Sequence, residues 1–152
     1  MTHDDFMKEA LKEAQLAYDK NEIPIGAIIV HDGNIIARAH NLRQHAQTTD
    51  AHAEMLAIKQ ANAAIGSWRL ENCTLYTTLE PCMMCAGAIV QSRMSTVVFG
   101  ATDEKAGCSG TIINLLAEPR FNHQCHIISG VCADESRTLL TTFFKQLRAS
   151  KT

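Results

Sequence analysis

Two cysteines three residues apart are the first residues in this chain whose types and spacing could do chemistry. Cys82 and Cys85 lie in the segment Pro-Cys-Met-Met-Cys. On one helical turn their sulfurs face the same side, where both can bind a tetrahedral metal ion at about 2.3 Å each. The same spacing also occurs in thiol redox motifs and in halves of structural zinc sites, so the pair alone leaves these interpretations open.

His52 and Glu54, earlier in the chain, favour a catalytic metal. One imidazole and two thiolates give zinc three protein ligands and leave its fourth position open to water, which is typical of catalytic sites. Zinc lowers the pKa of that water toward about 7. Glu54 is not needed as a ligand and is placed to move the proton. The pattern therefore predicts one zinc ion per chain, held by His52, Cys82 and Cys85, with Glu54 as the catalytic residue.

Two helices must position these side chains. Residues 54–64 are rich in helix formers, with Thr49 or Asp50 available as the N-cap, and Pro81 suits the entry to a second helix that runs to Ser92. The positive end of a helix favours thiolate over thiol. We therefore expect both ligand sets to lie at helix N-termini that point toward one metal.

The rest of the chain predicts an opening hairpin followed by alternating strands and helices. The expected elements are a helix over 5–20, strands over 25–30 and 35–39 around the turn at 32–33, a polar loop over 40–50, strands over 74–78, 96–99 and 124–128, a loop over 100–110, a short helix over 112–116 and a final helix over 133–148. This order indicates an α/β fold, a single domain over 1–152 with a mixed sheet of about five strands and helices on both faces.

Composition narrows the classes of protein to consider. The chain is 46% apolar and 20% charged, with a net charge of −2, so it has no overall attraction for nucleic acid or anionic membranes, and any such contact must be a local patch. No apolar run approaches the roughly 20 residues of a membrane span, and the acidic start is unlike a signal peptide. We expect a cytoplasmic protein with no membrane association, in which the six cysteines stay reduced.

The order His52-Ala53-Glu54 and then Pro81-Cys82-Met83-Met84-Cys85 matches a known signature of zinc-dependent nucleobase deaminases. Beyond this signature, the chain resembles the bacterial tRNA-specific adenosine deaminase family along nearly its whole length. The segments that carry the resemblance are 23–27, 51–54, 74–76, 79–88, 99–101 with Asp103 and Lys105, and the terminal pair Phe143-Phe144. The block around the cysteines is more specific than the shared deaminase signature.

The resemblance implies a three-layer α/β/α cytidine-deaminase-like fold, a homodimer, and conversion of the wobble adenosine in the anticodon of an arginine tRNA to inosine. It implies that Asn41 hydrogen-bonds the flipped base, that Ala53 and Pro81 offer backbone contacts to it, and that Asp103 lies by the ribose. Cys108, where a small residue such as alanine is expected, and Thr49-Asp50 before the His52 motif depart from the family pattern. These departures concern loop detail and sequence preference.

Other residues carry weaker signals. Phe143 and Phe144 are consecutive, so on a helix only one can face the core, and the other is free to stack on a base or pack on a partner subunit. A local phosphate-binding face and a scatter of solvated cations remain alternatives for the basic residues Arg38, Arg43, Lys145, Arg148 and Lys151. The unpaired cysteines are expected to be small buried side chains without a role: Cys73, Cys108, Cys125 and Cys132.

Two other functions fit the metal motif. A deaminase of a free base or nucleotide, such as cytosine or guanine, would use the same zinc site and differ in the pocket and loops. A structural zinc protein that binds a partner would close its metal shell with Cys108 or Cys125. This last interpretation leaves Glu54 without a purpose.

Overall fold

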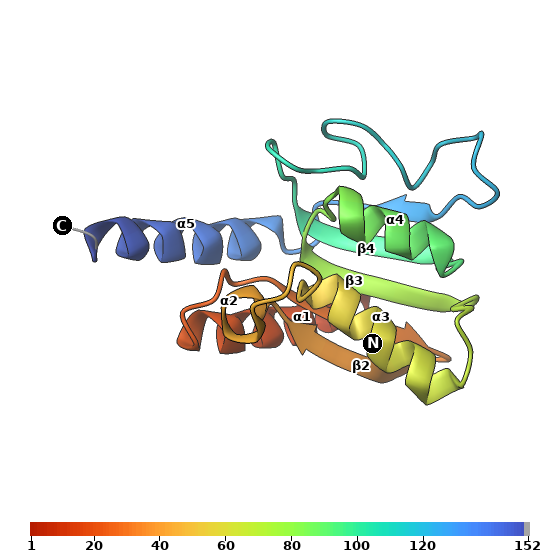
Figure 1. Cartoon of the computed structure of the whole chain (residues 1–152), viewed down its shortest axis with the longest axis horizontal. Helices are drawn as coiled ribbons and strands as arrows, with labels where there is room; N and C mark the ends of the chain where they lie inside the picture. Colours follow the sequence, from red (N-terminus) through yellow and green to blue (C-terminus); the bar gives the residue numbers. More distant parts are fainter. Residues whose placement is uncertain (151–152) are drawn as a thin grey trace.

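The computed structural model describes residues 1–150 as a five-stranded mixed sheet with helices on both faces (Figure 1). The strands are β1 (Gly26–His31), β2 (Asn34–His40), β3 (Cys73–Leu79), β4 (Thr96–Ala101) and β5 (His126–Ile128). The helices are α1 (His3–Asp19), α2 (Arg43–Ala46), α3 (Ala53–Ile65), α4 (Met83–Gln91) and α5 (Ala133–Ala149). Lys151, one of the candidate phosphate-binding cations, lies outside the described residues.

The strand order in the sheet is β2-β1-β3-β4-β5. β1 pairs antiparallel with both β2 and β3, whereas β4 runs parallel to β3 and β5 runs parallel to β4. The β1–β2 turn has positive φ at both Asp32 and Gly33, which suits a tight hairpin. The parallel pair β3–β4 needs a crossover, and α4 supplies it. The start of α4 therefore lies at the carboxyl end of β3.

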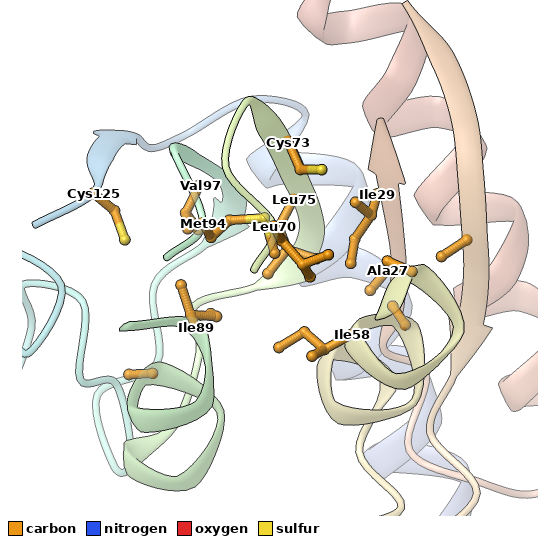
Figure 2. Packing of buried hydrophobic residues seen from close by; sticks show 14 of the residues in the cluster. Ala27, Ile29, Ile58, Leu70, Cys73, Leu75, Ile89, Met94, Val97 and Cys125 are labelled. Atoms are coloured by element: carbon orange, nitrogen blue, oxygen red, sulfur yellow. The ribbon is translucent and has the colours of Figure 1, made fainter. Parts of the chain in front are cut away.

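Alternate residues of β1 pack into two separate cores because successive side chains of a strand point to opposite faces. Ala27 and Ile29 join the cluster under α3 and α4, and Ile28 and Val30 join the cluster under α1. In Figure 2, Ile58 of α3 and Ile89 of α4 lie among the first cluster. This packing fixes the starts of α3 and α4 relative to the sheet.

The first and last helices lie together on the second face of the sheet. A capping box between Thr2 and Asp5 begins α1, whose buried stripe includes Phe6, Met7 and Ala10. The beginning of α5 packs on β4, and the rest of the helix extends beyond the sheet (Figure 1). Within residues 1–150, none of the helices combines the length and the apolar character that crossing a membrane requires.

The predicted hairpin, the five strands and the long helices are confirmed, but the short helix over 112–116 is wrong. That segment is an irregular loop in which the Ile112 and Leu115 N–H groups donate to the carbonyls of Gly107 and Cys108, and Ser109 forms an isolated bridge with Asn114. These N–H groups bond to backbone carbonyls elsewhere in the loop, which leaves them unavailable for the hydrogen bonds of a helix.

Two further details differ from the sequence prediction. The polar stretch over 40–50 contains the four-residue helix α2, which has no buried residue and therefore no apolar periodicity to reveal it. The N-cap of α3 is His52, with extended backbone angles and no side-chain cap hydrogen bond, and not Thr49 or Asp50. Ala51 donates to the Thr48 carbonyl, so the chain is still turning at Asp50 and enters the helix later.

Candidate active site

His52, Cys82 and Cys85 form one compact group of metal-ligand atoms. The His52 Nδ1 atom lies 3.6 Å from Cys82 Sγ and 3.5 Å from Cys85 Sγ. Zinc bonds of about 2.05 Å to nitrogen and about 2.3 Å to sulfur, meeting at a tetrahedral angle, would separate these atoms by about 3.6 Å. The three side chains therefore fit a tetrahedral zinc ion. Among residues 1–150 the potential ligand group contains these three donors, which leaves one position of such an ion for a small molecule.

Two helix N-termini bring the three ligands together. His52 is the N-cap of α3 and Cys82 is the N-cap of α4, with Cys85 in the first turn of α4. The first N–H groups of each helix have no partner within the helix and give this end a partial positive charge, which stabilises thiolate. The predicted placement of both ligand sets at helix starts is confirmed.

The two thiols differ in how easily they ionise. A hydrogen bond with Cys85 lowers the pKa of Cys82 to about 4 against the opposing effect of burial, and His52 adds to this lowering. The same hydrogen bond and burial raise the pKa of the Cys85 thiol. The hydrogen bond to Cys82 raises the pKa of His52. Cys82 is therefore the sulfur prepared to bind a cation, and Cys85 must release its proton on binding.

Glu54 lies in the first turn of α3, beside the ligand group, and is 4% exposed. Burial raises its pKa to about 7, although its own backbone N–H works in the opposite direction. A carboxyl group with this pKa exists in both protonation states near neutral pH, so it can accept a proton and return it. The described ligand group does not include Glu54, which leaves its carboxylate free for that task.

A cavity of about 190 Å³ opens directly over these side chains. Residues from five separate parts of the chain line it: Ile23, Ile25, Asn41, Arg43, His52, Ala53, Glu54, Leu79, Glu80, Cys82, Asp103 and Ala106. The structure thus brings Asn41, Ala53 and Asp103 together with His52 and Cys82, two of the candidate metal ligands. A larger depression of about 640 Å³ lies between α1 and α5, but its lining contains no histidine or cysteine, so the chemistry belongs to the smaller cavity.

Asn41 is held rigidly at the wall of this cavity. Its side-chain amide N–H donates to the Ile23 carbonyl at 3.4 Å, and its Oδ1 accepts from the Arg43 backbone N–H at 3.2 Å. The residue is buried. Pro81, in contrast, is not among the lining residues, and its carbonyl accepts a hydrogen bond from the Cys108 N–H.

Phe143 and Phe144 lie on α5 at a neighbouring depression of about 260 Å³. Ile23, Asn41 and Arg43 line both this depression and the site cavity, so the two are adjacent. Phe143 is buried with its ring edge toward Tyr18, whereas Phe144 is 37% exposed. The prediction that only one of the two rings can face the core is confirmed.

The candidate phosphate-binding cations that the structure describes lie on three different elements, β2, α2 and α5. Arg43 lines both depressions, while Arg38 lies on β2 and pairs with Glu9. Lys145 and Arg148 are exposed on the last turns of α5. Cys73, Cys108 and Cys125 are buried free thiols and Cys132 is partly buried, as expected of cysteines without a role.

Two buried carboxylates that the sequence did not reveal hold the loops around the cavity. Glu22, with no exposed surface, accepts hydrogen bonds from the backbone N–H groups of Gln44 and His45 and contacts His45 Nδ1 at 2.6 Å. Burial raises its pKa, but these hydrogen bonds lower it below the ordinary value overall. Glu80 is bound in the same manner to the loop after β4. Glu22 lies shortly before β1 and Glu80 lies shortly before α4. A glutamate in such a position gives no sequence signal that it is buried.

The chain is similar to known deaminases in sequence and in structure. Residues 1–148 match the family model of the MafB19-like deaminases. The chain is 59% identical over 152 residues to a tRNA-specific adenosine deaminase of Bacillus subtilis (strain 168), covering 99% of this chain and 94% of the relative. A solved structure from studies of A-to-I editing by tRNA:A34 deaminases at the wobble position of transfer RNA matches with a TM-score of 0.86 and 40% identity, covering 90% of this chain and 99% of the other.

A guanine deaminase structure from Bacillus subtilis is a more distant match. Its TM-score is 0.66 and its identity 35%, over 81% of this chain and 82% of the other. The mixed five-stranded sheet described above is thus the cytidine-deaminase-like fold that these structures share.

Proposed function

The chain belongs to the family of bacterial tRNA-specific adenosine deaminases, within the MafB19-like deaminases, and from this we propose that it is a zinc-dependent enzyme that converts adenosine to inosine in tRNA. In this proposal the substrate is the wobble adenosine in the anticodon of an arginine tRNA. Each chain binds one zinc ion. The observation that carries it is the spacing of His52, Cys82 and Cys85, which fits a tetrahedral ion, beside the buried Glu54.

Hydrolytic deamination exchanges the amino group at C6 of adenosine for an oxygen from water and releases ammonia. When bound, zinc supplies a Lewis acid that lowers the pKa of water to about 7. The Glu54 carboxylate accepts the proton that water gives up and transfers it to the departing amino group. Its pKa of about 7 suits both steps at neutral pH, and the burial that raises this pKa also keeps bulk water away from the proton.

The proposed contacts to the nucleoside follow from the lining of the cavity. Asn41 is fixed by two hydrogen bonds and is assigned to the base, with Ala53 offering a backbone contact. The backbone contact that the family resemblance implies for Pro81 has no support from the lining, because Pro81 does not line the cavity and its carbonyl already accepts from Cys108. Asp103 lies on the loop that follows β4 and is assigned to the ribose. Phe143 and Phe144 are assigned to the flanking part of the anticodon, because their depression adjoins the cavity.

A tRNA anticodon loop is a reasonable source for the base. A base inside a paired stem hides C6 within the stack, whereas a loop base is already unpaired and can enter a small cavity at lower energetic cost. We also propose a homodimer, the assembly that the family resemblance implies, and a cytoplasmic location for an enzyme that acts on tRNA.

A free-base deaminase is the second candidate, because the 35% identical guanine deaminase shares the fold. Parallel incubations of the zinc-loaded protein distinguish the tRNA deaminase from the free-base deaminase. The substrates are an anticodon stem-loop that carries adenosine at the wobble position, free adenosine, free guanine and free cytidine. We expect inosine in the stem-loop and little or no turnover of the free compounds. Turnover of guanine or cytidine with an untouched stem-loop would replace the tRNA proposal by the free-base alternative.

A further inference from the structure

The loop that follows β4, residues 102–111, is tied to one buried carboxylate. Glu80 is 2% exposed and directly follows β3. Its Oε1 accepts hydrogen bonds from the Asp103 N–H at 3.0 Å and from the Thr111 hydroxyl. Its Oε2 accepts from the N–H groups of Ser109 and Thr111 at 3.0 and 3.1 Å. Both ends of the loop therefore meet on a single side chain.

The backbone around Glu80 is fixed on both sides. The Glu80 N–H donates to the Ala101 carbonyl at the end of β4, and the Cys108 N–H donates to the carbonyl of Pro81. Cys82, the next residue, is a proposed metal ligand. The same short segment thus sets the position of the metal site and the position of the loop.

Gly107 shows how closely the loop packs on this carboxylate. A Cβ atom at residue 107 would lie 2.5 Å from the Glu80 carboxyl carbon and 2.5 Å from the Asp103 carbonyl oxygen. Such contacts are far inside van der Waals distance. The backbone at 107 can approach Glu80 because it carries no side chain.

The loop in turn supplies one wall of the cavity. Asp103 and Ala106 line it together with Asn41, and the Asp103 Oδ1 accepts from the N–H groups of Lys105 and Ala106. The four hydrogen bonds of Glu80 occupy both of its carboxylate oxygens. Although Glu80 also lines the cavity, each of its carboxylate oxygens already accepts two hydrogen bonds, so its carboxylate acts through the loop.

We propose that Glu80 is a positioning residue for the nucleoside, which holds the 102–111 loop at the distance from the metal site that lets Asp103 and Ala106 contact the substrate. The proposal rests on the deaminase function proposed above. Since the loop provides no metal ligand and no proton carrier, releasing it should weaken substrate binding while leaving the metal and the proton transfer in place. That pattern raises KM with little change in kcat.

The test compares Glu80→Gln with Glu104→Gln in the full-length, zinc-loaded protein. Glutamine keeps the shape of the side chain but turns one acceptor into a donor that faces other donors. Glu104 is exposed on the same loop, so its variant controls for the loss of one negative charge near RNA. For Glu80→Gln we expect a KM for the stem-loop raised about tenfold or more, a kcat within about threefold of wild type, and one zinc per chain. Glu104→Gln should resemble wild type.

Amide hydrogen exchange provides a readout that needs no substrate. The N–H groups of Asp103, Ser109 and Thr111 should exchange faster in Glu80→Gln and at wild-type rates in Glu104→Gln. If Glu80→Gln does not fold, Thr111→Val, which removes only the hydroxyl hydrogen bond, should still raise KM a few-fold with zinc retained. Combined with Glu80→Gln in a folded protein, its effect should be less than additive.

Other results would contradict the proposed role of Glu80. An unchanged KM in a folded Glu80→Gln protein, or a lower kcat with unchanged KM, overturns the proposal. If the wild-type protein does not act on the stem-loop but deaminates guanine or cytidine, only the proposed tRNA function is wrong. The role of Glu80 is then tested by the same KM comparison with guanine or cytidine as the substrate. Unchanged exchange at residues 103, 109 and 111 would contradict the role of Glu80 whatever the substrate.

Discussion

The Nδ1 atom of His52 lies 3.6 Å from the Sγ atom of Cys82, across the gap between the starts of α3 and α4. No single helix or strand contains both residues. The hydrophobic core that packs beneath both helices fixes their separation. This distance is the one that a shared tetrahedral zinc ion requires. The metal site is therefore a property of the whole fold, and the energetics of zinc binding and folding should be linked.

The linkage can be measured with Cys85→Ser. We expect purified wild-type protein to contain close to one zinc per chain and the variant to lose it, because a serine hydroxyl replaces a thiolate ligand. Loss of zinc should also lower the thermal midpoint, since a ligand that binds only the native state stabilises it. Elemental analysis and thermal unfolding check both points, with Cys132→Ser, a cysteine away from the site, as the control. Equal zinc content in wild type and Cys85→Ser would show that the metal binds elsewhere.

Glu54→Ala separates the proton carrier from the ligands. The variant should keep its zinc and its fold, because the three donor atoms remain in place. Its rate should fall by roughly 10²–10⁴-fold, the usual contribution of a positioned general acid–base. Single-turnover kinetics with parallel zinc analysis provide the measurement. Loss of zinc in this variant would mean that Glu54 is a ligand and that its assigned role is wrong.

Glu22 should make folding stability depend on pH. Hydrogen bonds to its carboxylate lower its folded-state pKa below the ordinary value of 4.5, despite its burial. A depressed pKa stabilises the fold above the unfolded-state value, and this stabilisation disappears as pH falls through the folded-state value. The free energy of unfolding should thus fall below about pH 5 more steeply in wild type than in Glu22→Gln.

Urea titrations across this pH range test the prediction. Glu104→Gln, which alters an exposed carboxylate, is the control and should follow the wild-type curve. The zinc ligands also become protonated in acid, but all three proteins share that effect, so the difference between the curves isolates Glu22. Parallel curves for wild type and Glu22→Gln would contradict the stabilising role of its ionised form.

The last turns of α5 should contribute phosphate contacts. Replacing Lys145 and Arg148 by alanine should weaken binding of the stem-loop and leave zinc in place, because both cations are exposed on α5 beyond Phe144. Each lost phosphate contact should reduce the slope of log affinity against log salt by about 0.7 for single-stranded RNA. Arg69→Ala, beyond the far end of α3, is the matched control. Equal slopes for the double variant and wild type would exclude this surface from RNA binding.

Residue type and spacing are sufficient to predict the sheet and to predict that His52, Cys82 and Cys85 lie together. His52, Cys82 and Cys85 belong to short local motifs, and the apolar periodicity of α1 and α5 is long enough to be unambiguous. The 112–116 loop was mistaken for a helix because its apolar residues satisfy a local pattern, whereas its backbone partners, Gly107 and Cys108, are set by tertiary structure.

The two buried glutamates could not be predicted for a related reason. Most of their partners are backbone N–H groups that lie 22 to 31 residues away in the chain. Every residue type except proline supplies such a donor, so these partners leave no trace in the sequence. Glu80 directly precedes Pro81, and Glu22 lies two residues before Pro24. A charged residue so close to a proline is typical of an exposed turn, but the fold buries both side chains.

The most direct test of the account is a zinc titration of the metal-free protein in the presence of an anticodon stem-loop whose wobble base is adenosine. Inosine at that position, measured by mass spectrometry of the digested RNA, should rise with added zinc and stop rising at one zinc per chain, with ammonia released in equal amount. Glu54→Ala should bind the same zinc and yield almost no inosine. Full activity in metal-free protein, or a zinc-loaded protein that leaves the wobble adenosine unchanged, would contradict the central claim.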